Sequence, residues 1–279
     1  GYTWVTQHIW LKEEGKYLEI EDSAEAWNKL TALRLRYVNY SITDIREGFL
    51  TQCWGLTTLD LSGLTYIKSY GNYFLNYCDK LTDVKWPNSN TLEKIGDDFM
   101  KDCSVYDGQI NLSNSVKTIG EEFMSGCYYF NSPLNLSNTL EQVGNHFLYD
   151  TDFFNQKIIL PESLHTIGNM FMAWSERFNQ ELVLNDTIKK IGDSFLYAYN
   201  DFDVTKLKNN SGIALGLVSR AEHWAAVAAL AVLLIILAIG IIYILTVAAA
   251  ASAASAAAAV TASETASAIA EGMAWDEGS

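Results

Sequence analysis

The sequence is poor in basic residues and in histidine, and both shortages limit what the chain can do. It has 19 Lys and Arg residues against 33 Asp and Glu, a formal net charge of −14 at pH 7. A chain of this charge is repelled by the phosphate backbone of nucleic acids, so we expect no nucleic-acid partner. The four histidines, at positions 8, 146, 165 and 223, lack the spacing of metal ligands. We therefore predict no metal site and no cofactor.

Catalytic sequence motifs are also missing. The chain contains no G-x-S-x-G, no G-x-x-x-x-G-K-S/T and no G-x-G-x-x-G, the motifs of a nucleophile elbow, a phosphate-binding loop and a dinucleotide site. Cys127 and His146 lie in neighbouring repeats, but His146 is expected to face solvent. The adjacent carboxylates of Asp97 and Asp98 are interpreted as the polar face of a turn. We predict that the chain is not an enzyme.

Cysteine is scarce, and the four that occur are spaced like a repeat: Cys53, Cys78, Cys103 and Cys127. Later repeats carry Thr151 and Ser175 at the same place. This phase indicates side chains that point into a core, where a thiol packs as a small apolar group. Neighbouring cysteines would lie about 4.8 Å apart in a stacked structure, so a disulfide or a metal remains the alternative. The cysteines do not decide the redox compartment.

The dominant feature of the chain is a segment of 24 or 25 residues that occurs about seven times. Copies such as IGDDFMKDCSVYD (95–107) and IGEEFMSGCYYFN (119–131) match closely, and looser copies begin at Ile45 and Tyr70. Each copy has a phenylalanine in the same place: Phe49, Phe74, Phe99, Phe123, Phe147, Phe171 and Phe195. Such a period is typical of a solenoid, whose repeats bury their apolar faces only by stacking. We expect the seven rings to share one interior, and the function to be binding along a surface.

Each repeat is predicted to supply one short strand and one short helical arc. The strands read apolar–x–apolar, as in Leu59-Asp60-Leu61 and Leu182-Val183-Leu184, and alternation turns both apolar residues inward. The strands should form a continuous parallel sheet, with the arcs as the opposite wall. A glycine follows the repeated isoleucine or valine, where we expect it to allow a tight corner between strand and arc: Gly96, Gly120, Gly144, Gly168 and Gly192.

The repeat resembles the leucine-rich repeats of the BspA-like type. The resemblance rests on the pattern IG-x-x-F-(L/M)-x-x-C-x-x-(F/L)-N-(Q/S)-x-L-x-L-(P/S)-x-(S/T)-L and covers roughly Leu33 to Leu207. It implies an α/β solenoid of the leucine-rich-repeat class. Such repeats occur in surface proteins of bacteria, some archaea and protists such as trichomonads. The resemblance therefore also implies surface display, adhesion or partner recognition, and no enzyme activity.

The core does not determine the third, fifth and sixth residues after each repeated phenylalanine. Six of these places hold an aromatic residue: Trp54, Tyr77, Tyr128, Tyr129, Phe153 and Trp174. Exposed aromatic side chains on one side of a solenoid are typical interface anchors. These residues are our candidate binding residues, for a protein, a glycan or another copy of the chain. The alternative is that the rings fold back and complete the packing of their own loops.

The N-terminal stretch, residues 1–31, does not follow the repeat and is predicted to cap the first open face of the solenoid. Tyr2–Trp10 and Lys16–Ile20 are interpreted as two strands, and Ser23 as the N-cap of a short helix. The solenoid itself is expected to occupy residues 32–211.

A long apolar run follows the repeats. We predict a hinge over 212–224 and a membrane-spanning helix over 225–247, which at 1.5 Å per residue covers a hydrocarbon core of about 30 Å. No charged residue lies between Glu222 and Glu264, and Trp224 stands where an interfacial aromatic would. The residues expected to face lipid, or the helices of an assembly, include Leu233, Leu234, Ile235, Ile236, Ile241 and Ile242.

Residues 248–279 are rich in alanine and serine. One interpretation is a flexible tail. The other is a single helix from about Ser219 to about Ala270, because alanine has the highest helix propensity and small residues let helices pack closely. Such a rod would suit the core of a filament or envelope assembly.

The orientation of the apolar helix has two conflicting indications. Lys206, Lys208 and Arg220 precede it and nothing basic follows it, which by the positive-inside rule places the repeats in the cytoplasm. The absence of Met at position 1, which a removed leader would explain, and the surface-type repeat favour repeats outside the cell. Five N-x-S/T sequons favour the same orientation, at Asn39, Asn111, Asn135, Asn185 and Asn209.

Two functional hypotheses remain. The first is a non-enzymatic cell-surface protein that binds a partner and is anchored by its C-terminal helix. The second is a structural subunit whose long helices pack in the core of a surface filament or envelope assembly, with the repeats displayed outside. Detergent-dependent monomers or small oligomers on isolation would favour the first, and detergent-resistant polymers the second.

Overall fold

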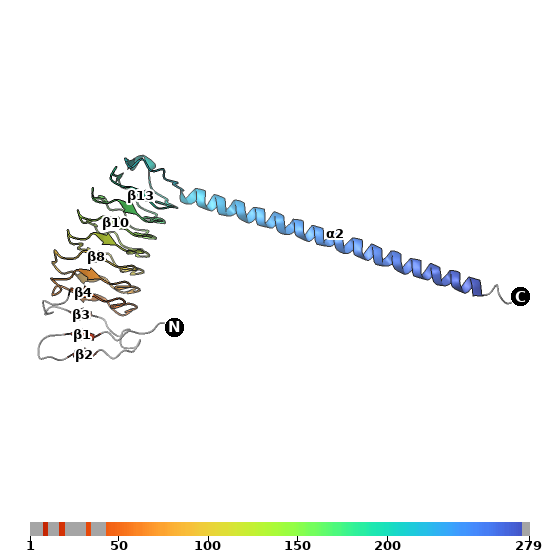
Figure 1. Ribbon diagram of the computed structural model, residues 1–279, viewed down its shortest axis with the longest axis horizontal. Helices are drawn as coiled ribbons and strands as arrows, with labels where there is room; N and C mark the ends of the chain where they lie inside the picture. Colours follow the sequence, from red (N-terminus) through yellow and green to blue (C-terminus); the bar gives the residue numbers. More distant parts are fainter. Residues whose placement is uncertain (1–7, 11–16, 20–31, 35–42, 275–279) are drawn as a thin grey trace. The chain divides into compact units, whose positions relative to one another are not determined.

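The computed structural model describes the backbone of four stretches: residues 8–10, 17–19, 32–34 and 43–274. Side chains are described from 43 to 267. The chain divides into two compact units, residues 1–223 and 224–279. In the first unit the repeats stack in chain order as the turns of a solenoid, as Figure 1 shows from β4 to β13. The leucine-rich-repeat solenoid and the long C-terminal helix predicted from the sequence are confirmed.

At the N-terminal end, β1 (His8–Trp10) pairs antiparallel with β2 (Tyr17–Glu19). These strands lie within the two segments expected to be strands. The helix expected after Ser23 lies outside the described residues, as does most of the expected cap.

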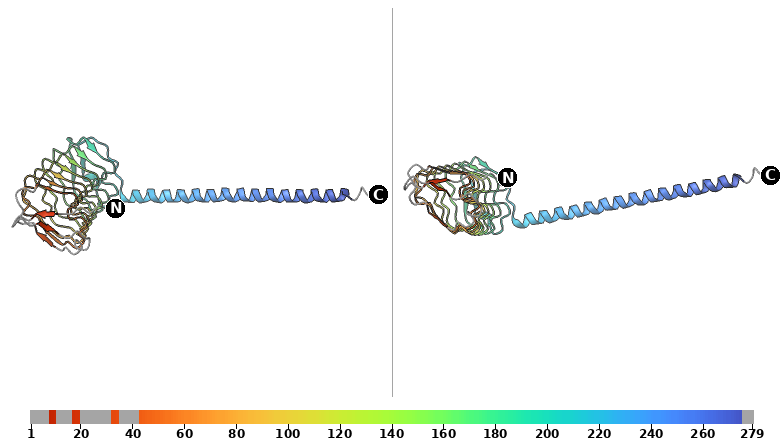
Figure 2. Two further views of the ribbon diagram at one scale, coloured as in Figure 1. Left: turned by 60° about the horizontal axis from the view of Figure 1, so that its bottom comes forward. Right: turned by 90° about the horizontal axis from the view of Figure 1, so that it is seen from below.

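The longest sheet of the solenoid has seven parallel strands of two residues each, one per turn. They are β4 (Asp44–Ile45), β6 (Ser69–Tyr70), β8 (Lys94–Ile95), β9 (Thr118–Ile119), β10 (Gln142–Val143), β11 (Thr166–Ile167) and β13 (Lys190–Ile191). Equivalent residues pair in register, as Ile95 does with Ile119. The turns therefore lie directly over one another, which Figure 2 shows in its right-hand view.

The sequence placed this continuous sheet on the wrong segment. The apolar–x–apolar segments pair only in pieces, in a sheet of β3 (Ala32–Arg34), β5 (Thr58–Asp60) and β7 (Asp83–Lys85), a pair of β12 (Leu182–Leu184) and β14 (Leu207–Asn209), and a bridge of Ile110 with Leu134. The two apolar side chains of each pair still point inward, as expected: Leu59, Leu61, Leu182 and Leu184 are buried.

Side-chain oxygens accept backbone N–H groups of the next turn just before these segments. The Oδ1 atom of Asn131 accepts the backbone N–H of Asn155 at 2.8 Å, and that of Asn155 accepts the N–H of Asn179 at 2.9 Å. Asp107 and Asp203 extend this asparagine ladder at its two ends. These N–H groups therefore have acceptors in addition to those of the strand pairs.

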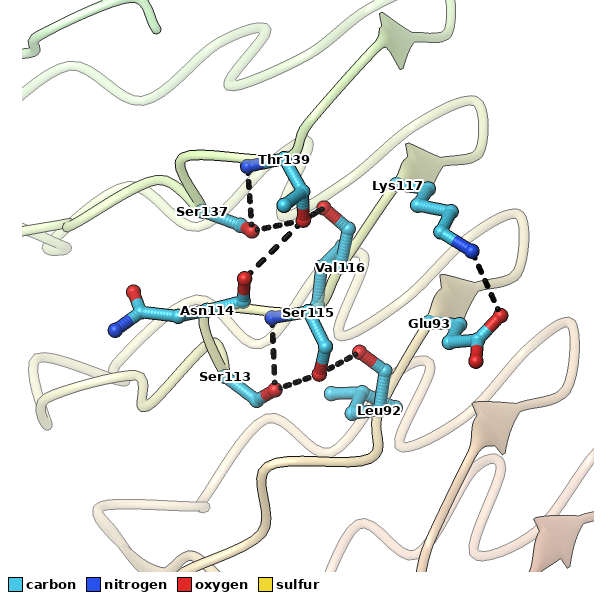
Figure 3. Close-up of polar contacts among 9 residues, drawn as sticks. All are labelled: Leu92, Glu93, Ser113, Asn114, Ser115, Val116, Lys117, Ser137 and Thr139. Atoms are coloured by element: carbon cyan, nitrogen blue, oxygen red, sulfur yellow. Dashed lines mark hydrogen bonds and ion pairs between the residues drawn. The ribbon is translucent and has the colours of Figure 1, made fainter. Parts of the chain in front are cut away.

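Serine and threonine hydroxyls form another ladder after the apolar–x–apolar segments (Figure 3). The N–H of Thr139 donates to Ser137 Oγ at 3.2 Å, and Thr139 Oγ1 donates to the carbonyl oxygen of Val116, one turn earlier, at 3.2 Å. Ser115 Oγ likewise donates to the carbonyl oxygen of Leu92 at 2.9 Å. Each turn is thus joined to its neighbour where it changes direction.

The repeated glycines serve close approach between turns, and not the tight corner that we expected. A Cβ atom on Gly144 would lie 2.5 Å from the carbonyl carbon of Gly120, and one on Gly168 would lie 2.4 Å from that of Gly144. None of these three glycines has a positive φ. Any larger residue would force neighbouring backbones apart.

The wall opposite the sheet is not made of helical arcs, and this part of the prediction is wrong. In every turn the residues one before, one after and three after the repeated phenylalanine have positive φ, for example Glu122, Met124 and Gly126. Right- and left-handed residues alternate, so the N–H groups point to the neighbouring turns. Met124 N–H donates to Phe99 in the preceding turn and Glu122 N–H to Asn145 in the next.

The spacing of the turns explains why helices are excluded from this wall. An α-helix is about 10 Å wide, whereas turns joined by sheet hydrogen bonds lie about 4.8 Å apart. An arc whose hydrogen bonds run between turns, as these do, can be stacked at that smaller spacing.

The interior contains the seven repeated phenylalanines, as predicted. Their rings stack one per turn, with centroids 5.2 Å apart for Phe123 and Phe147 and 5.1 Å apart for Phe147 and Phe171. All except Phe49, which is partly buried, are fully buried. A second column of rings lies beside the first: Tyr106, Phe130, Phe154, Phe178 and Phe202.

The solenoid ends in a 3-10 turn, η1 (Val204–Lys206), and β14. The stretch expected to be a hinge then packs on the last turn. Its Ile213, Leu215 and Leu217 contact the core, and the Ala198 N–H donates to the Val218 carbonyl at 2.7 Å.

The second unit continues the helix α2 (Arg220–Ala274), which has 55 residues. The apolar run of 225–247 and the alanine-rich segment as far as Ala274 therefore form one uninterrupted helix. This agrees with the rod interpretation and not with a flexible tail over the described residues.

Candidate functional site

The arc face, as we call it, consists of the third, fifth and sixth residues after each repeated phenylalanine. The backbone of one turn holds that of the next here: the Phe153 N–H donates to the Tyr128 carbonyl at 3.0 Å, and the Arg177 N–H to the Asp152 carbonyl at 3.1 Å. Residues 24 or 25 apart in sequence are therefore neighbours on this face. All six candidate aromatic residues belong to it.

Four of the six aromatic side chains are exposed on the arc face. The exposed fractions are 47% for Trp54, 40% for Tyr77, 40% for Tyr128 and 53% for Tyr129. Side chains of this size contact water at a free-energy cost unless something covers them. They are the strongest candidates for contact with a partner.

Phe153 and Trp174 are half-buried by neighbours. The ring of Phe153 lies between Tyr129, with centroids 5.0 Å apart, and the guanidinium of Arg177, whose Cζ is 3.8 Å from the ring centroid. Trp174 meets His223 edge to face at 5.0 Å. These two rings thus follow in part the alternative in which aromatic residues complete the local packing.

Carboxylates accompany the exposed aromatic residues, and the sequence analysis did not single them out. The negative charge of Asp102 raises the pKa of Tyr77, and the neighbouring Asp150 raises the pKa of Tyr128. Partial burial raises the pKa of both carboxyl groups above the usual range for aspartate. The signal available in the sequence was their place: Asp102 and Asp150 are both third after a repeated phenylalanine.

Two basic residues near the arc face, Lys101 and Arg220, already have acidic partners. Lys101 Nζ lies 3.3 Å from Asp98 Oδ1 and 3.4 Å from Glu122 Oε2. Arg220 pairs with Glu176. Their positive charges are therefore partly neutralised before any partner arrives.

Two further tyrosines are exposed on the solenoid, and the sequence analysis did not single them out. Tyr66 is 46% exposed and Tyr73 is 42% exposed. Tyr73 precedes Phe74, a position that we had not counted among those left free by the core.

The cysteines occupy the interior and are free thiols. The Sγ atoms of Cys78, Cys103 and Cys127 each donate to a backbone carbonyl of the preceding turn at 3.0–3.1 Å. Ser175 makes the same contact through its hydroxyl. Burial raises the pKa of Cys127, which disfavours the nucleophilic thiolate.

His146 lies elsewhere, with its Nδ1 atom 3.0 Å from Glu122 Oε1. Cys127 makes its own contact with a backbone oxygen, so the two side chains do not act as a nucleophile and its base. Within the described part of the chain, no group of three His, Cys, Asp or Glu residues has the arrangement of a metal site.

The large apolar side chains of α2 are exposed along its length. Their exposed fractions run from 40% at Val227 to 69% at Tyr243. By length and composition, α2 is able to cross a membrane. All of the residues predicted to face lipid or other helices are among the exposed ones: Trp224, Leu233, Leu234, Ile235, Ile236, Ile241 and Ile242.

Comparisons with known proteins relate the chain to one solved structure and to one family. A leucine-rich repeat protein from Bacteroides ovatus ATCC 8483, known from a crystal structure, is 16% identical with a TM-score of 0.39. The match covers 73% of this chain and 65% of that protein, so the chain spans slightly less than two thirds of its length. A comparison with curated proteins gave no match. The family described as "BspA type Leucine rich repeat region" matches residues 16–131 and 94–213 in six copies. The chain belongs to the BspA-type leucine-rich repeat family.

Proposed function

We propose that the chain is a non-enzymatic cell-surface protein that recognises a partner through the arc face and is anchored in a membrane by α2. The observation that carries the proposal is the gathering of exposed aromatic side chains on one face of a rigid stack. Rigid elements lose little conformational freedom on binding, which favours affinity. Aromatic anchors supply most of the binding energy in many interfaces.

The anchor follows from the apolar character of α2. The helix is about 80 Å long at 1.5 Å per residue, and a bilayer core is about 30 Å thick. The 225–247 run is sufficient to cross it. No soluble-protein core covers these side chains in the described structure.

We place the repeats on the outside of the cell. The family's surface-type repeats and the exposed sequon residues Asn111 and Asn135 support this orientation. The basic residues Lys206, Lys208 and Arg220 point the other way, so the orientation needs a direct test. Protease added to intact cells that carry the full chain should remove the repeats and leave α2 in the alkali-washed membrane. Full protection of the repeats would overturn the orientation.

Recognition through the arc face can be tested by a binding assay. The full chain, solubilised in detergent and coupled to beads, is applied to an array of extracellular proteins and glycans, and the retained beads are counted on each coating. The test variant is Trp54→Ala/Tyr77→Ala/Tyr128→Ala/Tyr129→Ala. We expect it to lose at least ten-fold in retention on whichever coating binds the wild type. A matched control replaces two exposed apolar residues away from this face, Ile159→Ala and Val204→Ala. Equal retention of the test variant and the wild type would overturn the arc face as the site.

A second function is favoured by one specific observation, the continuity of α2 past the 225–247 run. The helix extends to Ala274 although a single crossing needs only about 20 residues. Small residues predominate after Val247, and they allow helices to pack closely. The chain would then be a structural subunit whose helices pack with those of other copies in a filament or envelope assembly.

Isolation of the protein from cells distinguishes the two functions. An anchored receptor yields detergent-dissolved monomers or small oligomers, whereas a structural subunit yields polymers that persist in detergent. Electron micrographs of the material extracted from cells, together with its sedimentation in detergent, distinguish these outcomes. Monomers alone would exclude the assembly.

A further inference from the structure

The arc face combines aromatic and acidic side chains and has few basic ones. Besides its six aromatic residues, it carries six acidic residues, Asp79, Asp102, Asp150, Asp152, Glu176 and Asp201. Its basic residues are Lys80 and Arg177. Equivalent positions on successive turns lie about 4.8 Å apart, so carboxylates and rings alternate at the spacing of single side chains.

One position of this face already holds a guanidinium group. Arg177 lies over the ring of Phe153 at 3.8 Å, and Phe153 in turn contacts Tyr129. The charge of Arg177 also acts favourably on the carboxylate of Asp152. A ring beneath the guanidinium plane and a carboxylate nearby are the two contacts that this group prefers. The chain thus shows in its own structure what the face can hold.

The earlier turns repeat the same chemistry without an arginine. Tyr77 lies close enough to Asp102, and Tyr128 to Asp150, for each carboxylate to raise the pKa of its tyrosine. Among the described residues, neither aspartate forms an ion pair with a lysine or an arginine. Both carboxylates are partly withdrawn from water, as their raised pKa values indicate. A cation brought to this position would offset that loss of hydration.

The sequence makes room for the carboxylate of Asp102 itself. Gly126 occupies the equivalent position in the next turn, and a Cβ atom there would lie 2.2 Å from the Oδ1 atom of Asp102. The absence of a side chain leaves the carboxylate of Asp102 beside bare backbone. Asp102 and Asp150 are two turns apart, on either side of this glycine, at a spacing of roughly 10 Å.

We propose that the arc face between Trp54 and Asp150 binds an arginine-containing segment of a partner protein. The guanidinium groups would stack on the exposed rings, as Arg177 does on Phe153, and pair with Asp102 and Asp150. The inference rests on the proposed function and specifies the chemistry of the partner. Arginine fits better than lysine because its planar group stacks on rings and pairs with both oxygens of a carboxylate, whereas an ammonium is a compact, strongly hydrated charge.

The test measures binding of a fluorescein-labelled arginine nonapeptide to the full chain in detergent, by fluorescence anisotropy. A labelled lysine nonapeptide, which carries the same charge without guanidinium groups, tests whether binding requires arginine. The test variant is Asp102→Asn/Asp150→Asn. The matched control is Glu141→Gln/Glu162→Gln, which removes two exposed carboxylates outside the arc face and changes the net charge equally.

We expect the arginine peptide to bind at least five-fold more tightly than the lysine peptide. The Asp102→Asn/Asp150→Asn variant should weaken arginine binding at least ten-fold, and the control less than two-fold. If both variants weaken binding equally, the peptide is attracted only by the net charge of −14 and the proposal is wrong. Equal affinity for the two peptides would overturn the assignment to arginine.

Failure of this inference differs from failure of the proposed function. If the four-alanine variant loses its partner on the array while the arginine peptide does not bind, the arc face is the site and its partner is of another chemistry. If the four-alanine variant retains its partner, the site itself is misplaced.

Discussion

The solenoid buries its repeated apolar side chains, whereas α2 leaves its large apolar side chains exposed. In the solenoid, the repeated rings from Phe74 to Phe195 are at most 2% exposed, because each turn covers the next. Along α2, large apolar side chains are at least 40% exposed. The first unit therefore supplies its own apolar surroundings, and the second needs them from lipid or from other helices. Substitutions in the two units should differ accordingly.

The largest effect is expected from Phe147→Ala in the solenoid. The ring stacks between Phe123 and Phe171 and is fully buried, so its removal should lower the free energy of unfolding by about 3–5 kcal/mol. The control is Tyr129→Ala on the arc face, which should change it by less than about 1 kcal/mol. Chemical denaturation of both variants measures the difference. A Phe147→Ala protein as stable as the wild type would show that the ring column does not hold the turns together.

A substitution in α2 is expected to change membrane insertion and not the folding of the solenoid. Leu234→Arg places a charge at the centre of the 225–247 run, which should oppose membrane insertion by about 2.5–3.5 kcal/mol. The thermal unfolding of the solenoid should remain unchanged. Ala258→Arg, beyond that run, is the matched control. The alkali-resistant membrane fraction should fall only for Leu234→Arg if α2 crosses a bilayer, and equal losses of assembled material in both variants would favour the filament.

The spacing between turns is tested by Gly144→Ala. The new methyl group would lie 2.5 Å from the carbonyl carbon of Gly120, so we expect a loss of about 1–3 kcal/mol from overpacking. Gly216→Ala is the control, because no atom lies within 4 Å of its Cβ position. Midpoints of thermal unfolding measure both. A Gly144→Ala variant as stable as the control would mean that neighbouring turns separate without loss.

The smallest expected effect is a pH-dependent gain in folding stability when Asp150 on the arc face is replaced by Asn. Burial raises the pKa of Asp150, so the folded chain keeps this proton at a pH where the unfolded chain has lost it. Stability then falls as the pH rises between the two pKa values. Asp150→Asn should be more stable than the wild type at about pH 7, by less than about 1 kcal/mol because the group is partly exposed. The difference should vanish as the pH is lowered well below the ordinary aspartate pKa of about 3.9. Thermal melts at several pH values would reveal a constant offset if this reasoning is wrong.

The stack could be predicted because its cause is periodic. Seven phenylalanines in phase indicate seven stacked turns whatever the conformation between them. The arcs could not be predicted, because left-handed φ values fall on residues such as Leu50, Met100 and Leu148, which have no intrinsic preference for them. The conformation is set by hydrogen bonds to neighbouring turns, which local propensity does not contain. The long sheet was misplaced for a similar reason, since its strands are only two residues long.

The candidate site was predictable in its aromatic part and not in its acidic part. Trp54 and Tyr129 stood out because large apolar residues are unexpected at places that the core leaves free. Asp102 and Asp150 resembled ordinary solvated turn residues, and only their contacts with Tyr77 and Tyr128 separate them from the rest. The stacking of Arg177 on Phe153 could not be predicted either, because the two residues belong to different repeats.

The asparagine ladder has a consequence for the ageing of the protein. Asn131, Asn155 and Asn179 contribute a side-chain oxygen to the backbone N–H of the next turn, and Asp107 does the same with a carboxylate oxygen. Spontaneous loss of ammonia from one of these amides, with retention of the normal main-chain linkage, would preserve the accepting atom. Molecules that age in this way should become more acidic while their turns stay joined, whereas the isomerised linkage, which lengthens the main chain, should break the ladder.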